Sequence, residues 1–212
     1  MLARVMTVVI LVSLFLTADA AAQDFAKPQR HFRVERPASL EPADAMVIYE
    51  RILDDMVAAY AISEDPAARN YRKWRRYNRA PYRSATHGER FVNNYANGIA
   101  RDYGKFGGVG ELPVGSILAK DSFAVTAQGD VFTGPLFLME KMPKGFDPEG
   151  RDWRYSMILP DGSYFGITKG DNSARVEFCG TCHKIAGDDN DHLFFVPEDY
   201  RMRAFRLEDL KD

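Results

Sequence analysis

Cysteine is scarce in this sequence, with only two among 212 residues. Two thiols are too few for the disulfide scaffold that stabilises many small exported domains. Neither sign of charge is in excess, because the formal net charge is −2. A near-neutral chain lacks the broad field that attracts a polyelectrolyte, so nucleic acid is not an expected partner. Internal repeats and low-complexity tracts are also absent, which excludes repeat architectures.

The sequence also lacks an apolar run long enough to span a membrane, because the run near its start is short. Arg4 precedes the apolar residues 5–16, and small residues follow at 18–22. This order is typical of a secretory signal peptide. A membrane anchor is the alternative, but the run falls below the ~18 apolar residues that a spanning helix requires. We therefore expect residues 1–22 to be a signal peptide, and the mature protein to be exported with no membrane association.

Helical periodicity marks the first part of the mature chain. After an irregular stretch at residues 23–41, apolar side chains recur at three- and four-residue steps, which predicts an amphipathic helix from Pro42 to just before Pro66. Residues 69–83 are rich in arginine and aromatics, and predict either a solvated helix face with its aromatics turned inward or a docking patch for an acidic redox partner. Residues 86–103 again show helical steps, with a strand as the alternative for their first half.

The period of the apolar pattern changes to two after Val114. Four segments predict strands, and their connections are too short for parallel crossovers, so the strands must pair as antiparallel hairpins. The segments are residues 113–127, 131–142, 153–160 and 163–169. We therefore expect an α+β fold, an antiparallel β-sheet with an N-terminal helix. Residues 23–83 would form an N-terminal irregular and helical segment, and residues 84–212 one domain.

The two cysteines stand together near the end of the chain, in the stretch Cys179-Gly180-Thr181-Cys182-His183. This spacing is the attachment sequence of a c-type haem, in which each thiol bonds to one vinyl group of the porphyrin and the neighbouring imidazole binds the iron. Such attachment is made outside the bacterial cytoplasm, which agrees with the signal peptide and predicts a periplasmic protein. The sequence therefore predicts one covalently bound haem c, held by Cys179 and Cys182, with His183 as the axial iron ligand.

Three other uses of the same residues are open. A redox-active disulfide has the same CxxC spacing, but thioredoxin-like folds place it early in the chain rather than after most of the sheet. A zinc ion could take Cys179, Cys182, His183 and His192, although adjacent residues rarely reach one tetrahedral ion together. A structural disulfide would close a very small loop and add little stability. Haem attachment is favoured over all three.

The late position of the motif bears on the sixth ligand of the iron. A small helical cytochrome c draws a methionine ligand from well downstream, and the only downstream methionine here is Met202, in a charged segment. His192 is a second candidate, with an ordinary hydrogen-bonding histidine as the alternative. We expect instead a distal side built from the preceding sheet, with an open or weakly occupied position facing apolar side chains.

Together these segments resemble the cytochrome P460 family, which includes the sheet-rich cytochromes c′-beta. The resemblance covers residues 84–200 and rests on an ordered set of motifs: His87-Gly88, VNNYAN, LPVGSILAKDSF, LFLMEKM, DWRYSMILPDG, FCGTCHK and DHLFF. Known members are periplasmic c-haem proteins built on an antiparallel sheet, commonly homodimers. The resemblance implies a cytochrome P460-like haem domain at residues 84–212, with a C-terminal haem attachment helix.

The resemblance also implies site residues. Hydroxylamine-oxidising members link a lysine covalently to the haem ring, and the matching position here is Lys120, with a solvent-facing lysine as the alternative. A distal carboxylate accepts protons in those members. Glu140 and Asp152 lie near the corresponding segments, but either could equally be a surface acid in a turn.

The sequence thus carries two main functional hypotheses. The first is an exported mono-haem c-type cytochrome of the P460 type that oxidises hydroxylamine or nitric oxide and passes electrons to a soluble redox partner. The alternative is a c′-beta-like protein that binds nitric oxide without turnover, in an apolar pocket narrowed by Phe123, Phe137 or Leu138. A simple electron carrier is a third hypothesis, and it predicts a six-coordinate iron.

Overall fold

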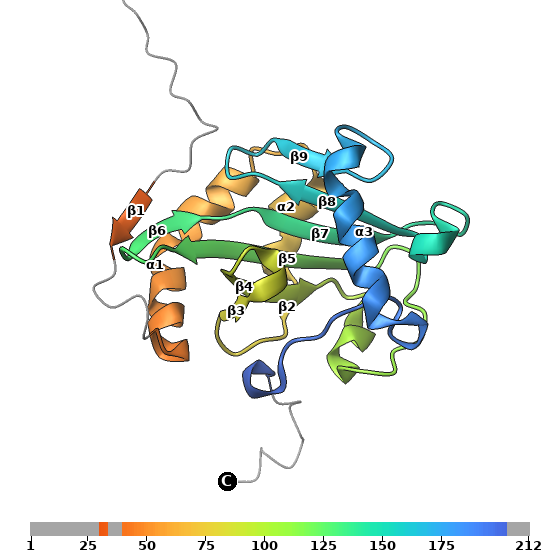
Figure 1. Ribbon diagram of the computed structural model, residues 1–212, viewed down its shortest axis with the longest axis horizontal. Helices are drawn as coiled ribbons and strands as arrows, with labels where there is room; N and C mark the ends of the chain where they lie inside the picture. Colours follow the sequence, from red (N-terminus) through yellow and green to blue (C-terminus); the bar gives the residue numbers. More distant parts are fainter. Residues whose placement is uncertain (1–29, 34–39, 203–212) are drawn as a thin grey trace, which may run out of the picture.

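Strands dominate the part of the chain that the structure describes, residues 30–33 and 40–202 of a computed structural model. Nine strands pair into one sheet in which every pairing is antiparallel, and helices lie on both of its faces (Figure 1). The α+β class with an antiparallel sheet is therefore as the sequence predicts. The expected signal peptide lies outside the described residues. Within them, no helix is long and apolar enough to cross a membrane.

The strands follow one another along the chain with short connections after residue 117. They are β1 (Arg30–Arg33), β2 (Arg75–Arg76), β3 (Tyr82–Ser84), β4 (Arg90–Ala96), β5 (Ile117–Val125), β6 (Asp130–Thr133), β7 (Leu136–Lys141), β8 (Trp153–Ile158) and β9 (Tyr164–Ile167). The main path through the sheet is β1-β6-β5-β7-β8-β9, and β4 pairs with the other edge of β5 and carries β2 and β3. β5 is therefore a central strand with neighbours on both sides.

The segment expected as one strand at residues 131–142 is two strands, β6 and β7, and the single-strand prediction is wrong at their junction. Pro135 has no amide proton to donate, so a sheet ladder cannot continue through it. The Gly134 amide donates to the Ser122 carbonyl at 2.8 Å, and the Ser122 hydroxyl donates to the Pro135 carbonyl at 2.6 Å. As a result β6 pairs with the second half of β5 and β7 with the first half.

Three helices complete the fold: α1 (Pro42–Tyr60), α2 (Pro66–Asn70) and α3 (Glu177–His183). α1 begins at Pro42 as predicted, since the fixed φ and missing amide proton of proline suit the first helical position. It ends at Tyr60, earlier than expected, and Asp65 caps the separate helix α2 by accepting a hydrogen bond from the Ala67 amide at 2.8 Å. Figure 1 shows α1 and α2 on one face of the sheet and α3 on the other.

The two faces of the sheet bury separate apolar clusters. The cluster under α1 and α2 includes Ile48, Tyr49, Ile52, Met56, Tyr60, Tyr71, Tyr95, Phe123, Leu136 and Ile158. The cluster on the face of α3 includes Tyr77, Tyr82, Val92, Tyr103, Leu112, Leu118, Trp153, Tyr155, Leu193 and Val196, with Cys179 packed against it. The boundary expected at residue 83 falls inside β3, and the helical segment before it shares its core with the sheet.

Three further segments differ from the sequence-based expectations. The stretch expected to be irregular contains β1, which pairs with β6. The helical steps at residues 86–103 belong largely to strand β4, so the strand alternative is correct for their first half. Both faces of β4 are covered by apolar residues, which hides the period of two. Residues 69–83 are not one helix but include β2 and most of β3, although Tyr71, Tyr77 and Tyr82 are buried as expected.

Candidate functional site

Helix α3 carries the CxxCH motif on the face of the sheet opposite α1. The helix has seven residues and continues at both ends into 3-10 turns, Ser173–Val176 and Lys184–Ala186. A spacing of three residues places Cys179 and Cys182 on the same side of a helix. Both are partly buried free thiols, and both line a pocket between α3 and the sheet.

His183 is buried and held in a defined orientation. Its Nδ1 lies 2.8 Å from the carbonyl oxygen of His192, which can only accept, so Nδ1 carries the proton and Nε2 is left with a lone pair. The imidazole packs against the rings of Tyr155 and Phe194 at centroid distances of 5.3 and 5.4 Å. Burial, with a smaller contribution from Lys120, lowers the pKa of His183 to about 4, so the imidazole is neutral at physiological pH.

The pocket has a volume of about 390 Å³, within the range of small-molecule and cofactor sites. Its apolar lining includes Leu118, Pro135, Phe137, Leu138, Met139, Met157, Leu159, Phe165, Phe178, Leu193 and Phe194. Its polar lining includes Thr86, His87, Arg90, Asn94, Tyr103, Lys120, Tyr155 and Ser156. Within the described residues, no aspartate or glutamate lines it.

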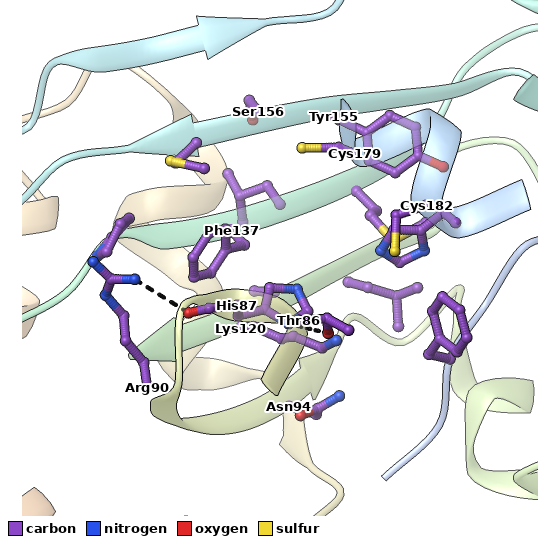
Figure 2. A pocket seen from close by; sticks show the side chains of 18 of the residues that line it. Thr86, His87, Arg90, Asn94, Lys120, Phe137, Tyr155, Ser156, Cys179 and Cys182 are labelled. Carbon is purple, nitrogen blue, oxygen red and sulfur yellow. Dashed lines mark hydrogen bonds between the residues drawn. The ribbon is translucent and has the colours of Figure 1, made fainter. Parts of the chain in front are cut away.

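Lys120 lies in the middle of β5, and Figure 2 shows it facing this pocket. Leu118, two residues earlier on the same side of the strand, also lines the pocket. Its strand neighbours are Asn94 on β4 and Phe137 on β7, which also line the pocket. No side-chain hydrogen bond or ion pair joins its ammonium to any described residue. Burial lowers the pKa of Lys120 to about 8, against a slight opposing effect of Cys182, so a larger fraction of the amine is neutral than for an exposed lysine.

His87 is the pocket residue whose placement the sequence did not indicate. It ends the 3-10 turn Ala85–His87, which leads through Gly88 in the left-handed region (φ 70°) into β4. Its Nδ1 lies 2.8 Å from the Ser84 hydroxyl, and its ring meets Phe137 edge-on at 4.8 Å. Burial and the nearby positive charges lower the pKa of His87 to about 2, so this imidazole offers a hydrogen bond and is a weak base. The His87-Gly88 pair before the strand indicates a turn, but a turn in the sequence does not show which cavity the histidine side chain faces.

Two buried polar atoms of the pocket residues have no partner among the described residues: Nε of Arg90 and the hydroxyl of Tyr155. Figure 2 shows Arg90 on the far side of His87 and Phe137 from the two cysteines. Buried polar atoms without partners are uncommon in native proteins. The Arg90 guanidinium donates from Nη1 to the His87 carbonyl at 3.2 Å, and its Nε is left for another partner. Two thiols and an imidazole at one end, apolar walls, and this nitrogen at the other end fit a flat apolar group with carboxylates remote from its attachment point.

The two acids considered as proton acceptors lie outside this pocket. Glu140 forms an ion pair with Arg154 on the adjacent strand. Asp152 accepts hydrogen bonds from the amides of Gly145 and Asp147, at 3.1 and 2.7 Å, and so closes the loop between β7 and β8. Both acids therefore have structural partners, and neither contributes to the pocket lining.

The other expected side chains divide between the pocket and the rest of the fold. Phe137 and Leu138 contribute to the lining, whereas Phe123 is fully buried in the cluster under α1. Met202 lines a different cavity beside three arginines, Arg72, Arg75 and Arg76. His192 offers its carbonyl to His183, but its own Nε2 lies 2.9 Å from the Asp188 carboxylate.

The redox-active disulfide, one alternative to haem attachment, finds little support in this geometry. A redox-active cysteine needs a lowered pKa, whereas burial raises the pKa of the Cys179 thiol to about 11. Among the described residues, no three side chains of histidine, cysteine, aspartate or glutamate are grouped as metal ligands.

Comparison of the chain with protein-family models finds no match, and comparison with curated proteins finds none either.

Proposed function

We propose that the protein is an exported, single-haem c-type cytochrome of the P460 type, and that its pocket takes a small nitrogen-oxide ligand. The observation that carries the proposal is the convergence of Cys179, Cys182 and His183 on one end of an apolar pocket. The thiols would hold the haem through thioethers, and the Nε2 lone pair of His183 would bind its iron. When bound, the haem supplies a redox-active iron with a site for a small ligand.

Residues of the chain define the space that such a ligand would enter. Phe137, Leu138 and Met157 provide apolar walls, which exclude water and favour an uncharged molecule. His87 and Lys120 are two of the titratable groups that line it, and each can donate a hydrogen bond to a bound ligand. Arg90, with its unpartnered Nε, would accept a carboxylate of the cofactor as its partner.

Binding of nitric oxide without turnover is the better supported of the two main hypotheses. Oxidation of hydroxylamine releases protons together with electrons, so it needs a base in the pocket. No described carboxylate lines the pocket, and His87, with its pKa near 2, is a poor acceptor. Lys120 could accept a proton only in its neutral form, and with a pKa of about 8 it is mostly protonated at neutral pH. Binding alone needs only the apolar walls and the axial histidine.

Lys120 favours the second function, oxidation of hydroxylamine or nitric oxide with transfer of electrons to a soluble partner. Its amine faces the pocket, has no ionic partner among the described residues, and has a lowered pKa. A neutral amine is a nucleophile, and a nucleophile here could form the covalent link to the haem ring that the family resemblance implies. The cavity lined by Arg72, Arg75, Arg76 and Trp74 would suit an acidic electron acceptor.

The test begins with the full chain, exported from a bacterial host that attaches c-type haem. Intact mass should show one haem on the wild type and on Thr181→Ala, a matched control, because among the described residues the Thr181 hydroxyl bonds to the helix backbone at Glu177 alone. The Cys182→Ala variant should lose the doubly linked form. A colourless wild type with the mass of the bare polypeptide would overturn the proposal.

The spectrum of the reduced protein and assays with two small molecules then separate the two functions. Nitric oxide binding with no consumption of hydroxylamine supports the binding function. Hydroxylamine consumption, with a reduced absorption maximum far to the red of ordinary haem c that is lost in Lys120→Met, supports oxidation instead. A six-coordinate iron that binds neither molecule would leave only electron transfer.

A further inference from the structure

Behind the axial histidine lies a buried charged cluster that the proposed function does not use. Asp191 is fully buried, at 0% exposure, and its carboxylate receives the Lys141 ammonium at 2.7 and 3.0 Å. The Arg151 guanidinium donates to the same carboxylate at 3.1 Å, and the Leu112 amide donates to it at 2.9 Å. Lys141 ends β7 and is itself 2% exposed, so the pair is anchored in the sheet.

The backbone at Asp191 is held as firmly as its side chain. The indole nitrogen of Trp153 donates to the Asp191 carbonyl at 2.8 Å. Asp191 and the next residue, His192, both lie in the left-handed region, with φ of 51° and 60°. Side chains other than glycine occupy that region at a cost in free energy, and they remain there only where surrounding contacts require it. The buried contacts of Asp191 therefore determine the course of the chain into His192.

The position of this backbone determines the only side-chain hydrogen bond that His183 makes among the described residues. The His192 carbonyl, one residue after the clamped Asp191, accepts from His183 Nδ1 at 2.8 Å. A hydrogen bond to Nδ1 selects the tautomer of an imidazole and increases the basicity of the other nitrogen. The position of one carbonyl oxygen thus sets how strongly Nε2 of His183 can donate electron density.

We propose that Lys141, Asp191 and Arg151 are positioning residues for His183: their buried ion cluster fixes the turn that presents the His192 carbonyl to Nδ1. This inference rests on the proposed function, because it concerns His183 as an iron ligand. It assigns to the cluster a role in tuning the redox potential, in addition to holding the chain together.

The direction of the effect follows from the hydrogen bond. A well-placed acceptor makes the imidazole a stronger donor, which favours the oxidised iron and lowers the midpoint potential. Loosening the turn weakens that acceptor, so the potential should rise. A cluster that did not position His183 would leave the iron–histidine bond unchanged, and the loss of its positive charge alone would lower the potential rather than raise it.

The experiment compares four variants of the haem-loaded protein: Lys141→Met, Arg151→Met, Lys141→Arg and Arg154→Met. Lys141→Met leaves the buried carboxylate with one cationic partner, and Arg151→Met removes a contact from a partly exposed side chain, 27% exposed, so that folding is less at risk. Lys141→Arg keeps the charge. Arg154→Met is the control, because Arg154 pairs with Glu140 on the same sheet, and no described hydrogen bond or ion pair joins it to residues 187–193, the turn that contains Asp191 and His192.

Two readouts are taken on each folded variant, the midpoint potential and the iron–histidine stretching frequency of the reduced protein. Lys141→Met should favour the reduced form about tenfold, an upward shift of about 59 mV for one electron, with a lower stretching frequency. Arg151→Met should shift both in the same direction by less, Lys141→Arg should restore most of the wild-type values, and Arg154→Met should change neither.

Each outcome decides the proposal. Wild-type potentials and frequencies in a folded Lys141→Met variant would overturn it while leaving the proposed function intact. If Lys141→Met does not fold, unchanged values in Arg151→Met would overturn it in the same way. A wild-type protein without attached haem overturns the proposed function, and this inference with it.

Discussion

Two neighbouring residues of the central strand, Lys120 and Asp121, face opposite sides of the sheet, and their surroundings differ sharply. Asp121 faces α1 and is fully buried. Its carboxylate accepts hydrogen bonds from Tyr49 at 2.6 Å, Tyr71 at 3.2 Å and Asn93 at 3.0 Å. Arg72 extends this network by donating to the hydroxyl of Tyr49 at 3.1 Å. On the face covered by α1 and α2, then, the buried polar groups form hydrogen bonds with one another.

On the other face, two polar groups of the pocket lack such partners. Lys120 makes no side-chain hydrogen bond with a described residue, and Nε of Arg90 has none either. Networks that are fully satisfied specify a core, whereas buried groups without partners require an explanation outside the chain. The comparison indicates that the polar groups under α1 and α2 stabilise the fold, whereas the pocket under α3 contains the unpartnered groups that the proposed ligand would contact.

Substitutions on the face of α1 and α2 should reduce the stability of the protein more than substitutions in the pocket. Asp121→Ala tests this and has the largest expected effect. The change removes the acceptor of three buried donors, of which Tyr49 has a second possible acceptor in the Tyr95 hydroxyl at 2.7 Å, and it removes the counter-charge of Arg72. We expect the free energy of unfolding to fall by about 3 kcal/mol. Chemical denaturation of the haem-loaded protein measures it, with the exposed Asp102→Ala as control. A loss below about 1 kcal/mol would show that the network is not structural.

The pocket face should respond to pH through His87. The pKa of His87 is about 2 in the folded protein and 6.5 in the unfolded chain. Below pH 6.5 the imidazole is therefore protonated in the unfolded chain but stays neutral in the folded protein. Unfolding is therefore favoured as the pH falls. Between pH 7 and 5 the wild type should lose about 2 kcal/mol more than His87→Gln, which cannot titrate in this range.

The pH experiment uses denaturation curves of the haem-loaded protein, in which His183 is bound to iron. The positive charges near His87 belong to Lys120 and Arg90, and their repulsion of a second positive charge acts in the same direction as burial. Ser84→Ala is the control, since it removes a hydrogen bond of His87 but keeps the imidazole. Parallel pH curves for the wild type and His87→Gln would contradict the burial of His87.

Lys120→Met should have a smaller effect on stability than Asp121→Ala or His87→Gln, because no described residue loses a hydrogen bond or ion pair with Lys120. A methionine of similar length removes a desolvated amine, so the free energy of unfolding should change by no more than about 1 kcal/mol, with a gain rather than a loss. The readout is denaturation together with the reduced absorption spectrum. A loss as large as that of Asp121→Ala would remove the contrast between the two faces of β5.

Local patterns account for what could be predicted, and long-range contacts for what could not. The period of two after Val114 and the short turns predicted the antiparallel sheet, and Pro42 predicted the start of α1. The CxxCH spacing located one wall of the candidate site, although its cofactor remains a prediction. Nothing local could show that Tyr49 would meet Asp121, 72 residues later.

The same limit applies to the distal part of the pocket. His87 enters the pocket because the turn before β4 brings it against Phe137, a contact that depends on the order of strands β4, β5 and β7. The resemblance placed Lys120 from its motif, but it could not decide whether Glu140 or Asp152 faces the pocket. Those two acids lie at strand ends and in turns, where the side chain can point either way, so only the folded chain shows their partners.

Glu140→Gln gives the smallest expected effect and tests the comparison from the other face of the sheet, because Glu140 alternates along β7 with the pocket residues Phe137 and Met139. Glu140 pairs with Arg154 across strands β7 and β8, with both side chains 30% exposed. A partly exposed ion pair contributes about 0.5 kcal/mol, so the stability should fall by no more than that. Nitric oxide binding and any hydroxylamine oxidation by the haem-loaded protein should match the wild type, as should its spectrum. If turnover were lost while the fold and spectrum persisted, Glu140 would have to reach the ligand in the loaded protein, and the pocket would contain the base that its present lining lacks.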